Sequence, residues 1–185
     1  MLELLLTLAV ATTMMAIAIP LTSNALDEAR TAMAARYLEG RIMDARMHAV
    51  SRSARVALRF EPSTDDYQIA EYLDGNGNGV RTAEISAGVD SPRAPRQFLR
   101  DSFSGVAFGL QPGVPDVDGS RAGGGVDGVR MGTSRLLTLA PDGTSSSGTL
   151  YVRGRRGQYA VRVLGATGRT RVLRFDAGAG QWVSR

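Results

Sequence analysis

A long uncharged apolar segment near the start of this chain constrains its fold more than any other feature. Residues 4–26 contain no charged side chain and consist mainly of Leu, Ala, Ile, Met and Thr. A helix of about 20 such residues is long enough to cross the hydrocarbon layer of a bilayer. We therefore expect residues 1–26 to form a single-pass membrane anchor.

The flanks of this segment argue against a cleaved secretory signal. Such a signal carries a basic region before its apolar core, whereas the first basic residue here is Arg30. The amino-terminal flank holds Glu3 instead, and a carboxylate costs about 2.5–3.5 kcal/mol at the centre of a bilayer. We expect Glu3 to stay at the interface or to have a partner.

The position of Glu3 and Pro20 in the apolar segment resembles the N-terminus of type IV pilins and type II secretion pseudopilins. In that family the glutamate guides assembly by pairing with the N-terminal amine of a neighbouring subunit, and Glu3 occupies the position of this glutamate. The family's proline kinks or melts the helix, as expected from the loss of a hydrogen bond, and Pro20 falls on that. The family's leader and methylated phenylalanine would precede Met1. We therefore expect either that the true start of the protein lies upstream of Met1 or that this chain has been clipped.

Residues 27–53 are expected to continue the anchor as an amphipathic helix. One face, which we expect to pack on the globular domain, carries apolar residues at helical spacing: Leu38, Ile42, Ala45 and Ala49. Three methionines fall roughly opposite: Met33, Met43 and Met47. Two apolar faces suit a helix packed between neighbouring subunits of a filament, and also a helix buried within a monomer.

From residue 54 onward the apolar pattern changes to the alternation of β-strands. The predicted strands are 54–60, 67–72, 135–139, 149–152, 158–163 and 171–175. Between them, residues 86–132 are rich in Gly, Pro, Asp and Ser and predict a long loop, with one strand near 106–110. We therefore expect an α+β, pilin-like fold, in which the N-terminal helix packs on an antiparallel β-sheet domain of residues 54–185.

The carboxy-terminal third is strongly basic. Residues 1–120 carry 11 Arg and 15 acidic residues, a net of −4, whereas residues 121–185 carry 11 Arg and 3 acidic residues, a net of +8. Such asymmetry favours a polyanion or an acidic surface as the partner of the basic part.

Two segments in this basic part resemble the GspH/FimT group of pilin-like proteins. They are residues 141–150 and the sequence Gly-Arg-Thr-Arg at 168–171. In DNA-uptake members a Gly-Arg-x-Arg element has been linked to DNA binding, and Arg169 and Arg171 fall on its arginines. A solvated, turn-forming basic strand is the alternative interpretation, and we prefer it because many secretion-type members carry the same element.

Metal and enzyme sites find little support. Residues 74–79, Asp-Gly-Asn-Gly-Asn-Gly, match the first half of a calcium loop. Ile85 stands where a bidentate glutamate is required, so we prefer a tight hairpin turn without a metal. There is no cysteine, and the only histidine, His48, is expected to be a surface or packing residue. No catalytic motif appears, so neither an enzyme nor a cofactor is expected.

The resemblance implies a minor pseudopilin of a type II secretion system that helps to initiate or cap a short filament for protein export. Its expected partners are other major and minor pilin-like subunits, an inner-membrane assembly platform and membrane lipid. Its expected location is the bacterial inner membrane, with the C-terminal domain in the periplasm or extracytoplasmic space. The alternative is a minor subunit of a type IV pilus that takes part in pilus assembly and DNA uptake.

Overall fold

One long helix and two antiparallel sheets make up the computed structural model, which describes residues 2–64, 66–119 and 127–184, the side chains of residues 2, 15 and 17–21 excepted. The elements in chain order are α1 (Leu2–Arg52), β1 (Val56–Pro62), β2 (Tyr67–Leu73), α2 (Thr82–Ser86), β3 (Ser91–Pro92), β4 (Gln97–Phe98), α3 (Leu99–Ser102), β5 (Ala107–Phe108), β6 (Val129–Arg130), β7 (Leu136–Leu139), β8 (Gly148–Arg153), β9 (Gln158–Leu164), β10 (Arg169–Asp176) and β11 (Gln181–Ser184). The predicted α+β class, with an N-terminal helix on antiparallel sheets, is thereby confirmed.

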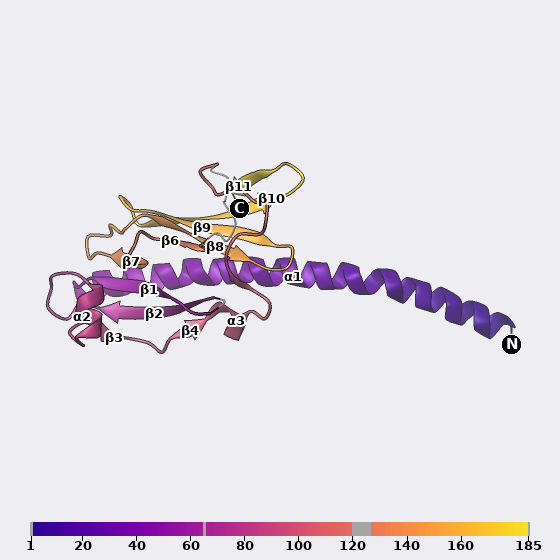
Figure 1. The fold of residues 1–185 in the computed structure, drawn as a ribbon, viewed down its shortest axis with the longest axis horizontal. Helices are drawn as coiled ribbons and strands as arrows, with labels where there is room; N and C mark the ends of the chain where they lie inside the picture. The colour runs from indigo at the N-terminus through magenta and orange to yellow at the C-terminus, as the bar shows by residue number, and fades with distance from the viewer. Residues whose placement is uncertain (1, 65, 120–126, 185) are drawn as a thin grey trace.

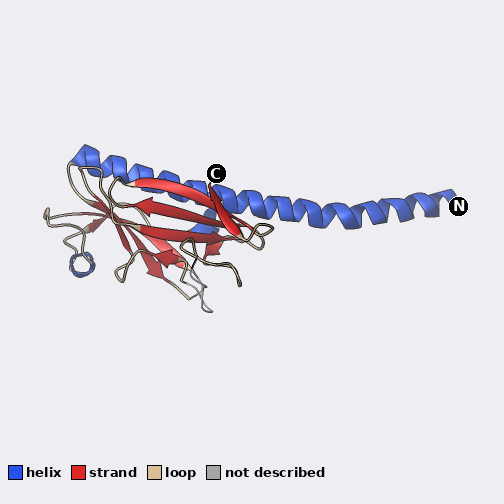
Figure 2. Ribbon diagram, turned by 90° about the horizontal axis from the view of Figure 1, so that it is seen from above, coloured by secondary structure: helices blue, strands red, loops and turns tan. Residues whose placement is uncertain are grey.

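Helix α1 has a free half and a packed half. Figures 1 and 2 show its first half projecting away from the sheets in a gentle curve, while its second half lies along them. The helix is continuous through position 20, and the Pro20 side chain, on which a kink was predicted, lies outside the described set. The helix ends where Ser53 adopts a positive φ of 49° and the Ala54 N–H bonds the Ala49 carbonyl at 3.2 Å.

The two sheets lie on either side of α1 in Figure 1. The first has the strand order β3-β2-β1-β7, with β4 also paired to β2. The second has the order β11-β10-β9-β8-β5, with β6 also paired to β8. Strands of both sheets contact α1, so the helix joins them into one body.

The main core forms between the packed half of α1 and the inner faces of the sheets. The helix contributes the predicted stripe, whose members are almost wholly buried: Leu38, Ile42, Ala45 and Ala49, together with Ala34 and Ala35. The alanines allow the helix backbone to approach the sheets closely, and larger side chains fill the space from the strands. Among these, Phe60 of β1 and Phe108 of β5 meet edge to face at 5.7 Å and connect the two sheets.

All six strands that the alternation predicts are present, as β1, β2, β7, β8, β9 and β10. The described part of residues 86–132 is more structured than the expected long loop. It contains β5 near the predicted strand at 106–110, and also β3, β4, α3 and β6, each of two to four residues. Helix α2 and strand β11 were not predicted either, because neither has a buried residue that would mark an apolar face.

Candidate functional site

The free half of α1 exposes a continuous apolar surface. Its described large side chains are between 50% and 73% exposed: Leu4, Leu5, Leu6, Leu8, Val10 and Met14. The hydroxyls of Thr7, Thr12 and Thr13 donate to carbonyls three or four residues earlier in the same helix. These hydroxyls therefore need no water or outside partner, which suits an apolar environment.

Within the described side chains, no helix combines the length and the apolarity that a membrane crossing requires. Glu3 lies in the first turn of α1 and is exposed, far along the helix from the sheet domain. Its position leaves the carboxylate accessible to a group outside this chain, which the predicted assembly role requires.

Asp27 fixes the point at which α1 leaves the domain. Its carboxylate accepts backbone N–H bonds from Arg155 at 2.9 Å, Arg156 at 2.8 Å and Gly157 at 3.2 Å, all in the turn between β8 and β9. Desolvation raises the pKa of this carboxyl, but the three backbone bonds and the Arg155 charge outweigh it, so the pKa of Asp27 lies below its usual value. The turn is thus held on the helix by a charged group.

The close approach of this turn requires glycine. A Cβ atom at Gly157 would lie 2.8 Å from the Thr31 Oγ1 atom, and one at Gly154 would clash with the same hydroxyl. Next to this contact, Glu28 accepts a hydrogen bond from the Tyr159 hydroxyl at 2.8 Å and pairs with Arg174 Nε at 2.8 Å. Together these contacts attach the second sheet to one turn of α1.

The packed half of α1 has a second apolar face that no described part of the chain covers. Met33, Met43, Met47 and Val50 are 51%, 56%, 63% and 51% exposed. Three of these are the methionines opposite the core stripe. Since methionine side chains are flexible and adapt to irregular surfaces, this stripe is a suitable contact for another helix.

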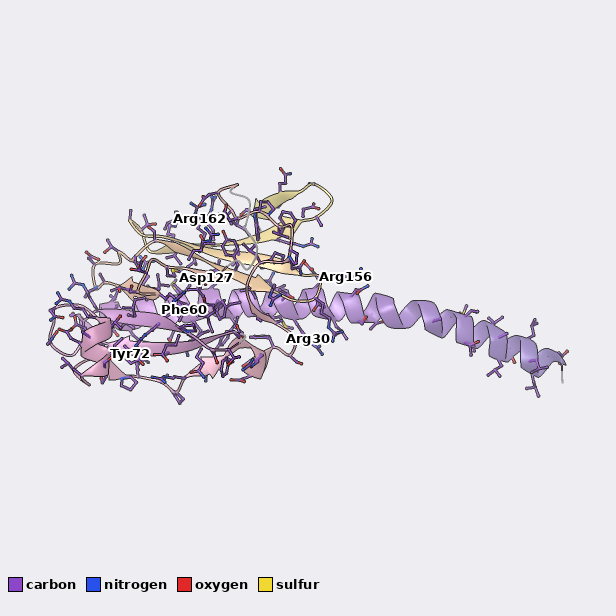
Figure 3. All side chains as sticks on the ribbon, in the orientation of Figure 1. Arg30, Phe60, Tyr72, Asp127, Arg156 and Arg162 are labelled. Atoms are coloured by element: carbon purple, nitrogen blue, oxygen red, sulfur yellow. The ribbon has the colours of Figure 1, made fainter. Side chains whose placement is uncertain are left out.

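Arg169 and Arg171 lie on the outer face of the second sheet. Between them, Thr170 points to α1 and donates to Glu39, so the alternation of β10 directs the two arginines away from the helix. Both are exposed, and neither forms an ion pair with a described carboxylate. Arg162 of β9, labelled in Figure 3, stands directly opposite Arg171 but is paired with Asp118 at 2.8 Å.

The 74–79 segment forms a compact loop before α2. The Asp74 carboxylate accepts N–H bonds from Asn76, Gly77 and Gly79, while the amides of Asn76 and Asn78 donate to Glu84 Oε1. In the described parts of the chain, no group of three or more acidic, His or Cys side chains is arranged to hold a metal ion. These hydrogen bonds hold the loop in its compact shape.

A buried ionic cluster on the other side of α1 was not predicted. Glu71 of β2 is 2% exposed and pairs with Arg93 at 2.5 Å and with Arg41 of α1 at 3.4 Å. The Nδ1 atom of His48 lies 3.6 Å from the same carboxylate, so the lone histidine packs at this cluster. The cluster ties the first sheet to α1, as Asp27 and Glu28 tie the second.

No protein-family model, curated protein or solved structure matches this chain.

Proposed function

We propose that the chain is a membrane-anchored structural subunit of a thin extracytoplasmic filament, of the type II secretion pseudopilus class, and not an enzyme. The observation that carries this proposal is the free half of α1, which extends beyond the domain. Its large apolar side chains are exposed and follow an exposed Glu3 in the chain. The resemblance of Glu3 and Pro20 to the pilin N-terminus supports the same conclusion.

The proposed mechanism is mechanical and uses the two apolar surfaces of α1. In the membrane, the free half lies among lipid chains, and the domain stays on the extracytoplasmic side. During assembly, the free half leaves the lipid and the methionine stripe leaves water. Both surfaces then pack against the helices of neighbouring pilin-like subunits. Glu3 directs this step because a carboxylate in an apolar environment gains strongly from an adjacent amine.

Photo-cross-linking in cells of the source organism tests this proposal. A photoreactive phenylalanine analogue at Met43 should form adducts with other filament subunits, whereas the same analogue at the exposed Ser86 of α2 should form few. Glu3→Ala should abolish the Met43 adducts, while the protein level stays unchanged. A full yield of Met43 adducts in the Glu3→Ala variant would contradict the assembly role of Glu3.

A second candidate, a minor type IV pilus subunit that handles DNA, is favoured by the two arginines of β10 that pair with no described carboxylate. Phosphate contacts through Arg169 and Arg171 would be independent of base sequence and strongly sensitive to salt. Binding of duplex DNA by the full chain in detergent, measured across a salt series, tests it. Binding that is lost in Arg169→Ala/Arg171→Ala would favour the pilus function, and its absence at low salt would leave the secretion function.

A further inference from the structure

Three exposed arginines lie close to the point where α1 leaves the domain. Arg30 lies on the helix, and Arg155 and Arg156 lie in the turn between β8 and β9. We call this group the arginine collar. Figure 3 shows Arg30 and Arg156 beside α1 at this end of the domain, and the bonds from the turn to Asp27 hold the collar in place.

The acidic residues next to the collar balance only part of its charge, since Asp27, which interacts with the Arg155 charge, is one carboxylate beside three arginines. Asp27 is covered by the backbone N–H groups of the turn, and Glu28 is engaged by Arg174 and Tyr159. Among the described residues, no carboxylate forms an ion pair with any arginine of the collar. This end of the domain therefore presents positive charge toward the free helix.

The spacing along α1 places the collar at the depth of lipid headgroups. The charge-free segment 4–26 spans roughly 34 Å as a helix, close to the hydrocarbon thickness of about 30 Å. Arg30 follows Leu26 by about 6 Å, which is similar to the thickness of one headgroup layer. An inserted helix would thus bring Arg30 and the turn of β8 and β9 to the membrane surface.

We infer that the arginine collar binds the phosphates of anionic phospholipids and holds the domain against the membrane before assembly. This inference rests on the proposed membrane anchor. Guanidinium groups suit the task because they bind phosphate oxygens through paired hydrogen bonds and are always charged. Basic residues next to a membrane segment are attracted to an anionic surface, and this attraction weakens within a Debye length.

Energy transfer between the full chain and vesicles tests the inference. The chain has no cysteine, so a single cysteine at Ala177 can carry a donor fluorophore. Ala177 is exposed and follows β10 at the collar end, since Arg174 of this strand pairs with Glu28. The acceptor is a headgroup-labelled lipid in vesicles of phosphatidylcholine alone or mixed with phosphatidylglycerol.

Transfer should be higher in the mixed vesicles at low salt and fall to the phosphatidylcholine value at high salt. Arg30→Gln/Arg155→Gln/Arg156→Gln should lose this dependence on composition and salt. The matched control, Arg52→Gln/Arg55→Gln/Arg81→Gln, removes the same charge from exposed arginines near the other end of α1. Energy transfer in this control should still depend on lipid composition and salt.

Flotation of the same samples separates the two proposals. If the chain floats with both kinds of vesicle but transfer does not depend on phosphatidylglycerol or salt, the collar inference is wrong and the anchor stands. If the collar and control variants lose the dependence of transfer on phosphatidylglycerol and salt to the same extent, the inference is also overturned, because net charge alone would then explain the effect. A chain that floats with neither kind of vesicle overturns the anchor and the collar together.

Discussion

At the residue scale, the carboxylate of Asp27 is the contact that decides how the domain is mounted on α1. Its three backbone partners lie 128 to 130 residues away in the chain, so no local sequence pattern predicts these contacts. The same holds for Glu71, whose partners come from α1 and from the segment after β3. The sequence predicts Glu3, Arg169 and Arg171 as candidates, because a terminal glutamate and a basic strand are visible without tertiary contacts.

Asp27→Asn should lower the free energy of unfolding by about 1–3 kcal/mol, since charge-assisted hydrogen bonds are lost and an amide N–H₂ group faces backbone donors. Urea unfolding of the full chain in mild detergent measures the change. The control is Asp176→Asn, whose carboxylate accepts two N–H bonds within its own exposed turn, and a loss below about 1 kcal/mol is expected there. Equal losses in the two variants would contradict the special role of Asp27.

The contribution of Asp27 should also depend on pH. Folding lowers the pKa of this carboxyl below its usual 3.8, so its contribution is complete above that value. It is lost as the pH falls through the pKa of the folded state. The difference in unfolding free energy between the wild type and Asp27→Asn should therefore be constant near neutral pH and shrink below about pH 4. A difference that grew with acidity would contradict this assignment.

At the element scale, α1 combines a buried stripe with an exposed one. The helical spacing predicts both stripes, and the stripe that contains Leu38 is the one expected to pack on the domain. The structure confirms this prediction, since Leu38 is 1% exposed and Met43 is 56% exposed. Six strands of four to eight residues were predictable for a similar reason, since alternation over that length reports one buried face, whereas two-residue strands carry no such signal.

Replacing the two stripes should have opposite consequences. Leu38→Ala should lower the free energy of unfolding by about 2–5 kcal/mol through the cavity it leaves. Met43→Ala should change it by less than about 0.5 kcal/mol but weaken the contact with neighbouring subunits. Thermal unfolding, together with the yield of filament cross-links at a photoreactive Met47, measures both effects. A large loss of stability in Met43→Ala would show that this face packs within the chain.

At the scale of the whole molecule, a domain of two sheets sits at one end of a helix whose other half has no partner within the described chain. The net charge changes from −4 in residues 1–120 to +8 in residues 121–185, and the basic part supplies every strand of the second sheet except β5, together with β7 of the first sheet. Asp27, Glu28 and Glu71 attach the sheets to α1, whereas Arg169 and Arg171 of β10 and the arginines of the collar are exposed. The proposed contacts with lipid, other subunits or a polyanion would use these exposed surfaces.

The membrane anchor is the central claim, and alkaline extraction of membranes from the source cells tests it most directly. The account predicts that the native chain stays in the membrane pellet, while Leu5→Glu/Leu8→Glu releases it with its domain still folded. It also predicts that protease added from the extracytoplasmic side digests the domain. Recovery of the native chain in the soluble fraction, without any treatment, would contradict the account.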